Sequence, residues 1–346
     1  MTIGLSVLDQ SPISQGMTGG QALRNSIDLA ATAERAGYTR YWVAEHHGTS
    51  MLACASPEAL IGPIASATSR LRVGSGGVML PHYSPLKVAE TFSMLSGLYP
   101  RRIDLALGRA AGTDPLTAFM LQRDRRHPAP DDFPEQLAEL LALVKGDLSL
   151  DHRFRRLAQL PGGQDRPTPW LLGSSAQSGV WAAELGLPYA FADFINPAGS
   201  SIARRYRTSF MPSSTQATPQ VIVAVSAICA ETDREAERLA ASSRMAFTLF
   251  LQGEFIQVPP VEAALRFFEE HPDAAQVLTG RRRAVIGSPA TVREGLLEVA
   301  ADYGADEIMV VTITHEHSAR RRSYELLAAE CGLAQGTSLG EVSGRF

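Results

Sequence analysis

The chain has 346 residues, of which 45% are hydrophobic and 20% are charged. This balance is typical of a globular protein with a packed core, and it excludes a disordered, collagenous or fibrous chain. The net charge of −4 is spread along the sequence, so it gives no electrostatic footprint for nucleic acid or for an anionic membrane. Small molecules are therefore the expected partners.

The cysteines and the N-terminal segment predict a cytoplasmic protein. The three cysteines form no C-x-x-C pair, which argues against a disulfide framework and against a thiolate metal site. The first residues include no basic segment followed by a long apolar one, and no apolar run approaches ~18 residues, the length of a membrane span. We expect neither secretion nor insertion into a membrane.

Short apolar or β-branched runs alternate with longer segments of helical periodicity along the whole chain. This alternation is typical of repeated β/α units. In chain order, the predicted strands cover residues 3–8, 41–44, 71–75, 103–107, 170–172, 189–192, 221–229 and 307–312. The predicted helices cover residues 22–36, 57–68, 86–98, 134–144, 178–185, 202–210, 234–245, 289–303 and 320–331.

Eight such units predict parallel strands joined by right-handed crossovers. At this length a closed (β/α)8 TIM barrel is the economical solution, and an open doubly wound sheet is the alternative. We expect a single domain over residues 1–346, with an insertion at 250–286 that interrupts the repeat before the last strand. In a barrel, chemistry is expected at the carboxyl ends of the strands.

Two adjacent histidines, His46 and His47, directly follow the strand at 41–44. This position places both imidazoles at the expected active face. A structural histidine bonded to a neighbouring loop is the alternative. Metal binding is disfavoured, because the segment is not H-E-x-x-H and no third ligand lies at a readable spacing. We therefore expect no metal site.

A pair of glycines, Gly76 and Gly77, follows the strand at 71–75. The segment is not a dinucleotide-binding G-x-G-x-x-G motif, because Met79 occupies the place of the last glycine. Paired glycines at a strand end indicate a bulge or a backbone that approaches a flat ligand closely, and a tight turn is the alternative.

The next two strand ends carry groups suited to an anion. Arg109 follows the strand at 103–107, and a guanidinium at the barrel mouth suggests phosphate or carboxylate, with an ordinary ion pair as the alternative. The strand at 170–172 leads into a serine-rich segment, 173–178, which opens a helix. Free amides at a helix start bind phosphate, although simple helix capping would explain the same residues.

With these strand ends in view, the sequence resembles the bacterial luciferase-like flavin monooxygenases, in particular the single-chain luciferase-like oxidoreductases, some of which tailor aromatic polyketides. The resemblance covers almost the whole chain. It is carried by residues 5–9, 41–47, 72–81, 99–109, 170–175, 287–289 and 322–327. It implies a (β/α)8 barrel with an insertion before the last strand.

The resemblance also implies the roles of the site residues. His46 matches the catalytic histidine beside the reactive edge of the flavin, and His47 is its companion. Gly76 and Gly77 would lie beneath the isoalloxazine ring, often with a cis peptide between them. The residues that would hold the phosphate of FMN are Arg109, Gly173, Ser174, Ser175 and Ser178.

Three positions depart from the luciferase α chain. Gly108, Ser174 and Asp193 stand where that chain has a cysteine, a glutamate and a tryptophan. These departures argue against light emission.

The activity that the resemblance implies is that of the oxygenase half of a two-component system. A flavin reductase would deliver FMNH2, and the C4a-peroxyflavin formed with oxygen would oxidise a small organic substrate. A deazaflavin (F420) enzyme that transfers hydride and a flavin-binding protein without turnover are the alternatives. The helices at 57–68 and 86–98 offer a face for a homodimer.

Overall fold

The computed structural model describes residues 3–110, 113–122, 124–127, 131–149, 151–152, 154–157, 159–274 and 284–333. Within these ranges, eight parallel strands pair in the closed order β1-β2-β3-β4-β5-β6-β7-β9, and β9 pairs back to β1. The strands are β1 (Gly4–Asp9), β2 (Arg40–Val43), β3 (Arg72–Met79), β4 (Ile103–Gly108), β5 (Thr168–Gly173), β6 (Tyr189–Ala192), β7 (Val221–Cys229) and β9 (Glu307–Val311). The predicted (β/α)8 TIM barrel is confirmed, and the open sheet is excluded by the pairing of β6 with β7.

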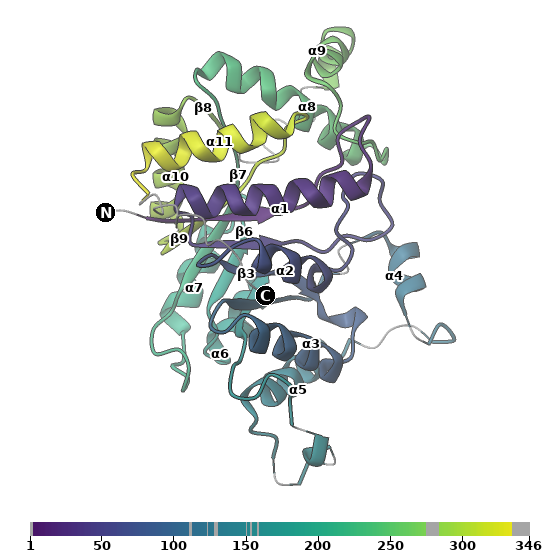
Figure 1. Ribbon diagram of the computed structural model, residues 1–346, viewed down its shortest axis with the longest axis vertical. Helices are drawn as coiled ribbons and strands as arrows, with labels where there is room; N and C mark the ends of the chain where they lie inside the picture. The colour runs from purple at the N-terminus through teal and green to yellow at the C-terminus, as the bar shows by residue number, and fades with distance from the viewer. Residues whose placement is uncertain are drawn as a thin grey trace, which may run out of the picture.

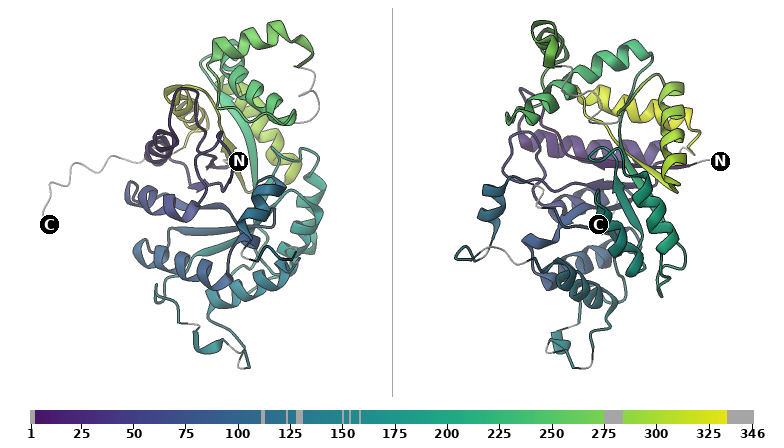
Figure 2. Two further views of the ribbon diagram at one scale, coloured as in Figure 1. Left: turned by 90° about the vertical axis from the view of Figure 1, so that its right-hand side faces the viewer. Right: turned by 180° about the vertical axis from the view of Figure 1, so that it is seen from behind.

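Helices surround the barrel on all sides (Figures 1 and 2). The α-helices are α1 (Gly19–Ala36), α2 (Pro57–Ser66), α3 (Pro85–Leu98), α4 (Pro115–Leu121), α5 (Phe133–Lys145), α6 (Ala176–Glu184), α7 (Ser200–Ser209), α8 (Asp233–Leu251), α9 (Val261–Glu270), α10 (Pro289–Tyr303) and α11 (His317–Glu330). Two short 3-10 helices cover Leu80–His82 and Arg155–Leu157. In the described ranges, none of these helices combines the length and hydropathy needed to cross a bilayer.

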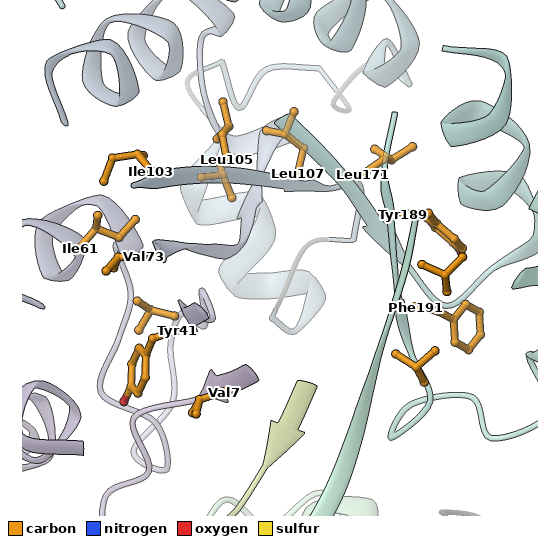
Figure 3. Packing of buried hydrophobic residues seen from close by; sticks show 14 of the residues in the cluster. Val7, Tyr41, Ile61, Val73, Ile103, Leu105, Leu107, Leu171, Tyr189 and Phe191 are labelled. Atoms are coloured by element: carbon orange, nitrogen blue, oxygen red, sulfur yellow. The ribbon is translucent and has the colours of Figure 1, made fainter. Parts of the chain in front are cut away.

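The side chains of the strands form two apolar layers, one outside the barrel and one inside it. Successive side chains of a strand point to opposite faces of the sheet. Val7, Tyr41 and their counterparts on the other strands point outward and pack under the helices, as Figure 3 shows. Their neighbours Leu8 and Trp42 point inward and pack with Trp170 in a second cluster. Side chains therefore fill the barrel interior.

Buried charges close the end of the barrel where the strands begin. Arg40 pairs with Glu307 at 2.8 Å and with Asp104 at 2.9 Å. Asp104 also accepts hydrogen bonds from Arg72 and from the indole Nε1 of Trp42. Charged groups this deeply buried require such partners. These ion pairs seal the base of the barrel.

The segment expected as an insertion, 250–286, contains the end of α8, all of α9 and the short strand β8 (Ala284–Gly287). β8 pairs with the last residues of β7, Ser226–Cys229, outside the closed barrel. The predicted helix at 234–245 is too short, because α8 continues to Leu251 with Ala246 and Leu249 buried. Part of the segment, 275–283, lies outside the described residues.

The connection after β4 contains a helix, α4, where the sequence predicts none. α4 begins at Pro115, and the Asp114 side chain caps it by accepting hydrogen bonds from the amides of Leu116 and Thr117. An aspartate at the N-cap followed by proline at the first helical position is a known start signal. No residue of α4 is buried, and it lies beside the barrel mouth, at the right of Figure 1.

Candidate functional site

Four neighbouring strands carry all the site residues that the sequence predicts. β2, β3, β4 and β5 are adjacent in the barrel. His46 and His47 follow β2, Arg109 follows β4, and β5 leads into 173–178. Because parallel strands end on the same side of a barrel, these groups share one part of the mouth.

The glycine pair lies inside a strand, so the prediction of a strand end at residue 75 is wrong. β3 continues to Met79, and its register with β4 shifts between Gly76 and Val78. The bulge is therefore observed, and the tight turn is excluded. The peptide bond between Gly76 and Gly77 is cis, as the resemblance implied.

Neither glycine has space for a side chain. A Cβ atom on Gly76 would lie 2.6 Å from the Leu8 side chain, and one on Gly77 would lie 2.5 Å from the Leu172 side chain. Contacts this short do not occur between real side chains. The bare backbone of β3 is therefore required by its packing against neighbouring strands.

Among the described residues, His46 has a buried ring nitrogen with no hydrogen-bond partner. Its backbone amide donates to the carbonyl oxygen of Cys54 at 3.0 Å, which fixes the loop. The ring Nδ1 is buried and has no hydrogen bond within the described chain. Burial, assisted by the neighbouring His47, lowers the pKa of His46 from 6.5 to about 4. The imidazole is therefore neutral at pH 7, and a buried polar atom of this kind suits a polar ligand.

His47 is held by a buried carboxylate. Its Nε2 lies 2.8 Å from Oε1 of Glu45, and Oε2 of Glu45 accepts a hydrogen bond from the amide of Met79 at 3.1 Å. The backbone carbonyl of His47 accepts a hydrogen bond from the hydroxyl of Thr113 at 2.9 Å. The His82 ring meets the His47 ring edge-on, with their centres 5.7 Å apart.

Arg109 extends from the end of β4 towards α6. Its guanidinium carbon lies 5.6 Å from the centre of the Trp181 ring, on the second turn of α6. The same guanidinium pairs with Asp131 at 2.9 Å, and both side chains are at least half exposed. Exposed ion pairs contribute little free energy, so an incoming anion can replace Asp131.

The start of α6 presents free backbone amides. Ser175 caps the helix by accepting from the amide of Ser178, and the Ser178 hydroxyl donates to the Ser175 carbonyl and also hydrogen-bonds Tyr189. The amides of Ala176 and Gln177 have no acceptor in the described part of the chain. A helix start with unpaired amides next to an arginine is suited to a phosphate.

Gly173 and Ser174 shape the approach to this helix. A Cβ atom on Gly173 would lie 2.5 Å from the hydroxyl oxygen of Ser178, so only glycine leaves that hydroxyl in place. The carbonyl oxygen of Ser174 accepts a hydrogen bond from the Asn196 side chain at 2.9 Å. Backbone and side-chain bonds therefore hold the whole segment in one conformation.

Glu45, Asp131 and Trp181 also contact the candidate site residues, although no pattern in the sequence predicts these contacts. Glu45 precedes the two histidines, but its bond to Met79 depends on the pairing of β2 with β3. Trp181 meets Arg109 only because β4 and β5 are neighbours, whereas Asp131 meets it because the connection after β4 returns to the end of that strand before α5 begins. No group of three or more histidine, cysteine, aspartate or glutamate side chains arranged for a metal occurs among the described residues.

The chain is similar in sequence to known monooxygenases along most of its length. Residues 1–307 match the model of one protein family, described as luciferase-like monooxygenase. A luciferase-like monooxygenase of Escherichia coli (strain K12) is 40% identical over 328 residues, covering 94% of this chain and 96% of that one. An N-acetyl-S-alkylcysteine monooxygenase of Bacillus subtilis (strain 168) is 35% identical over 328 residues, covering 94% and 97%.

One solved structure is similar to this chain in both fold and sequence. The crystal structure of apo-MsnO8 matches with a TM-score of 0.87 and 41% sequence identity, and the match covers 96% of this chain and 100% of that one. The likeness therefore extends over the whole barrel and includes every strand that carries a site residue.

Proposed function

The chain belongs to the luciferase-like monooxygenase family, and on this basis we propose that it is an FMN-dependent monooxygenase that uses reduced FMN and O2 to oxidise a small organic substrate. It would be the oxygenase of a two-component system in the cytoplasm. Its proposed partners are a flavin reductase that supplies FMNH2 and a second copy of the chain.

The observation that carries this proposal is the anion site between β4 and β5. The guanidinium of Arg109 lies against α6, whose first amides are unpaired within the described residues. A phosphate monoester needs both charge-assisted bonds and backbone donors, and this site offers both. Arg109 and the segment with Gly173, Ser174, Ser175 and Ser178 would hold the phosphate of FMN.

The remaining site residues suit the ring of a flavin. As the resemblance implies, the backbone at Gly76 and Gly77, with its cis peptide, would lie beneath the isoalloxazine. The Nδ1 of His46, which has no partner among the described residues, fits a polar atom at the edge of the ring. Reduced FMN, when bound, supplies the electrons that activate O2. His46 is neutral at pH 7, so it can accept a proton or a hydrogen bond there, and His47 would assist it.

Flavin titration and oxygen uptake test the proposal. The purified protein should bind FMN more tightly than riboflavin, which lacks the phosphate, and it should consume O2 when given FMNH2. If F420 binds and hydride transfer proceeds without O2 uptake, the deazaflavin alternative is correct. If FMN binds but FMNH2 reoxidises at the rate of free flavin, the protein is a carrier without turnover.

A further inference from the structure

Glu45 occupies a fully enclosed position between the ends of β2 and β3. Only 1% of its surface is exposed, and its two carboxylate oxygens are divided between different partners. Oε1 faces Nε2 of His47 at 2.8 Å, and Oε2 faces the amide of Met79 at 3.1 Å. A buried carboxylate whose two oxygens have different partners has little freedom to turn.

This arrangement determines which nitrogen of His47 carries hydrogen. An ionised carboxylate only accepts hydrogen bonds, so Nε2 of His47 must donate to it. A neutral imidazole has one N–H, and the other nitrogen then carries a lone pair. The lone pair is therefore on Nδ1 of His47, which has no hydrogen bond to the described part of the chain.

We propose that Glu45 is a positioning residue, which holds the proton of His47 on Nε2 and thereby keeps Nδ1 as the nitrogen that exchanges a proton in the reaction. The inference rests on the proposed function, in which His46 and His47 act beside the flavin. Glu45 also joins the histidine loop to β3 through Met79, two residues after Gly77. One side chain therefore fixes both the tautomer of His47 and its position relative to the glycine pair.

The variant Glu45→Gln reverses the tautomer without changing the size of the side chain. The amide of Met79 needs an acceptor, so the amide oxygen of the glutamine takes the place of Oε2. Its NH2 group then replaces Oε1 and donates to Nε2 of His47. Nε2 becomes an acceptor, and the proton moves to Nδ1. An incorrect tautomer can cost a histidine-dependent enzyme several orders of magnitude in rate.

Nuclear magnetic resonance reads the tautomer directly, without any flavin. Long-range 1H–15N correlations of protein labelled with 15N-histidine identify the protonated nitrogen, and His47→Gln assigns the signals. We expect Nε2–H in the wild type and Nδ1–H in Glu45→Gln. Reoxidation of protein-bound FMNH2 by O2 should slow by more than about tenfold in Glu45→Gln, with the Kd for FMN within threefold of wild type.

A matched control lies outside the site. Nε2 of His317 on α11 pairs with Asp28 on α1 at 2.8 Å, the same kind of contact. Asp28→Asn should alter only the His317 signals and should leave FMNH2 reoxidation unchanged.

Two results would overturn the inference: an Nδ1–H tautomer in the wild type, or a reversed tautomer in Glu45→Gln with reoxidation unchanged. If Glu45→Gln does not fold, the wild-type spectrum and the reoxidation rate of His47→Gln decide instead, and that rate should also fall. A wild-type protein that binds no FMN would contradict the proposed function, whereas the spectrum would still report on the pairing of Glu45 with His47.

Discussion

Arg109 has exchangeable partners, which makes it the most direct test of the phosphate site. Its ion pair with Asp131 is exposed and it also contacts the Trp181 ring, so removing it leaves neither of these described partners as a buried charge. Arg109→Ala should weaken FMN binding by about 1.5–3 kcal/mol, or about 10- to 150-fold in Kd, the scale of a hydrogen bond to a charged group. Fluorescence titration measures the change.

The same variant has an internal control. Riboflavin has no phosphate, so its affinity should be the same in Arg109→Ala and in the wild type. Arg126→Ala removes another exposed arginine, whose partner is Asp124, and it should leave FMN affinity unchanged. Unaltered FMN affinity in Arg109→Ala would place the phosphate elsewhere.

His46 should make stability depend on pH in a defined window. Its pKa falls from 6.5 in the unfolded chain to about 4 in the folded protein. Below pH 6.5 the unfolded chain therefore binds a proton that the folded protein does not. The free energy of unfolding should fall between pH 6.5 and pH 4, by at most about 3 kcal/mol from this group.

Urea unfolding at pH 7, 6 and 5 measures this effect. His46→Gln should flatten the profile, because glutamine does not titrate. His127→Gln changes an exposed histidine and should leave the profile as in the wild type. If the free energy of unfolding depended on pH equally in His46→Gln and in the wild type, His46 would be protonated in the folded protein over this pH range.

At the scale of elements, periodicity and chain order were enough to predict the barrel. The exact ends of the strands and the contacts between them depend on tertiary pairing, which periodicity does not show. The strand count and the order of the units follow from local patterns in the sequence. The continuation of β3 through Gly76 and Gly77 does not, because it depends on pairing with β4. The hydrogen bond between Glu45 and Met79 could not be predicted either, because it depends on the pairing of β2 with β3, although both residues follow predicted strands.

The sealed base of the barrel gives a prediction about stability alone. Asp104 is fully buried and pairs with Arg40 and Arg72, while Trp42 also donates to it. Asp104→Asn removes the negative charge that compensates two guanidinium groups, so it should lower the free energy of unfolding by about 3–5 kcal/mol. Flavin affinity should be unchanged, because the base and the mouth are opposite ends of the strands.

An exposed ion pair provides the comparison. Glu262→Ala removes a contact with Arg238 at 2.9 Å in which both side chains are more than 40% exposed. The cost should be at most about 1 kcal/mol. Denaturant midpoints of the two variants, measured side by side, separate a buried network from a surface pair, and similar losses would contradict the role given to Asp104.

Across the whole molecule, the last strand and the last helix contact the first strands where the barrel closes. β9 pairs with β1, and the hydroxyl of Tyr38 donates to the carbonyl of Tyr324 on α11. Arg320 on α11 pairs with Asp9 at the end of β1 at 2.6 Å, and Asp9 also accepts from Tyr41. No local pattern reveals these contacts, since their partners stand near opposite ends of the sequence.

Arg320→Met tests this closure. The variant leaves the carboxylate of Asp9 buried without its cation, and we expect a loss of about 3–5 kcal/mol at pH 7. Arg320 and hydrogen bonds hold the pKa of Asp9 below its usual value against the effect of burial, which raises it. Without Arg320 the pKa should rise, so Asp9 in the variant becomes neutral on mild acidification. The difference in the free energy of unfolding between Arg320→Met and the wild type, measured by urea unfolding, should therefore shrink between pH 7 and pH 4.5. If this difference did not depend on pH, the packing of the Arg320 side chain and not its charge would stabilise the closed barrel.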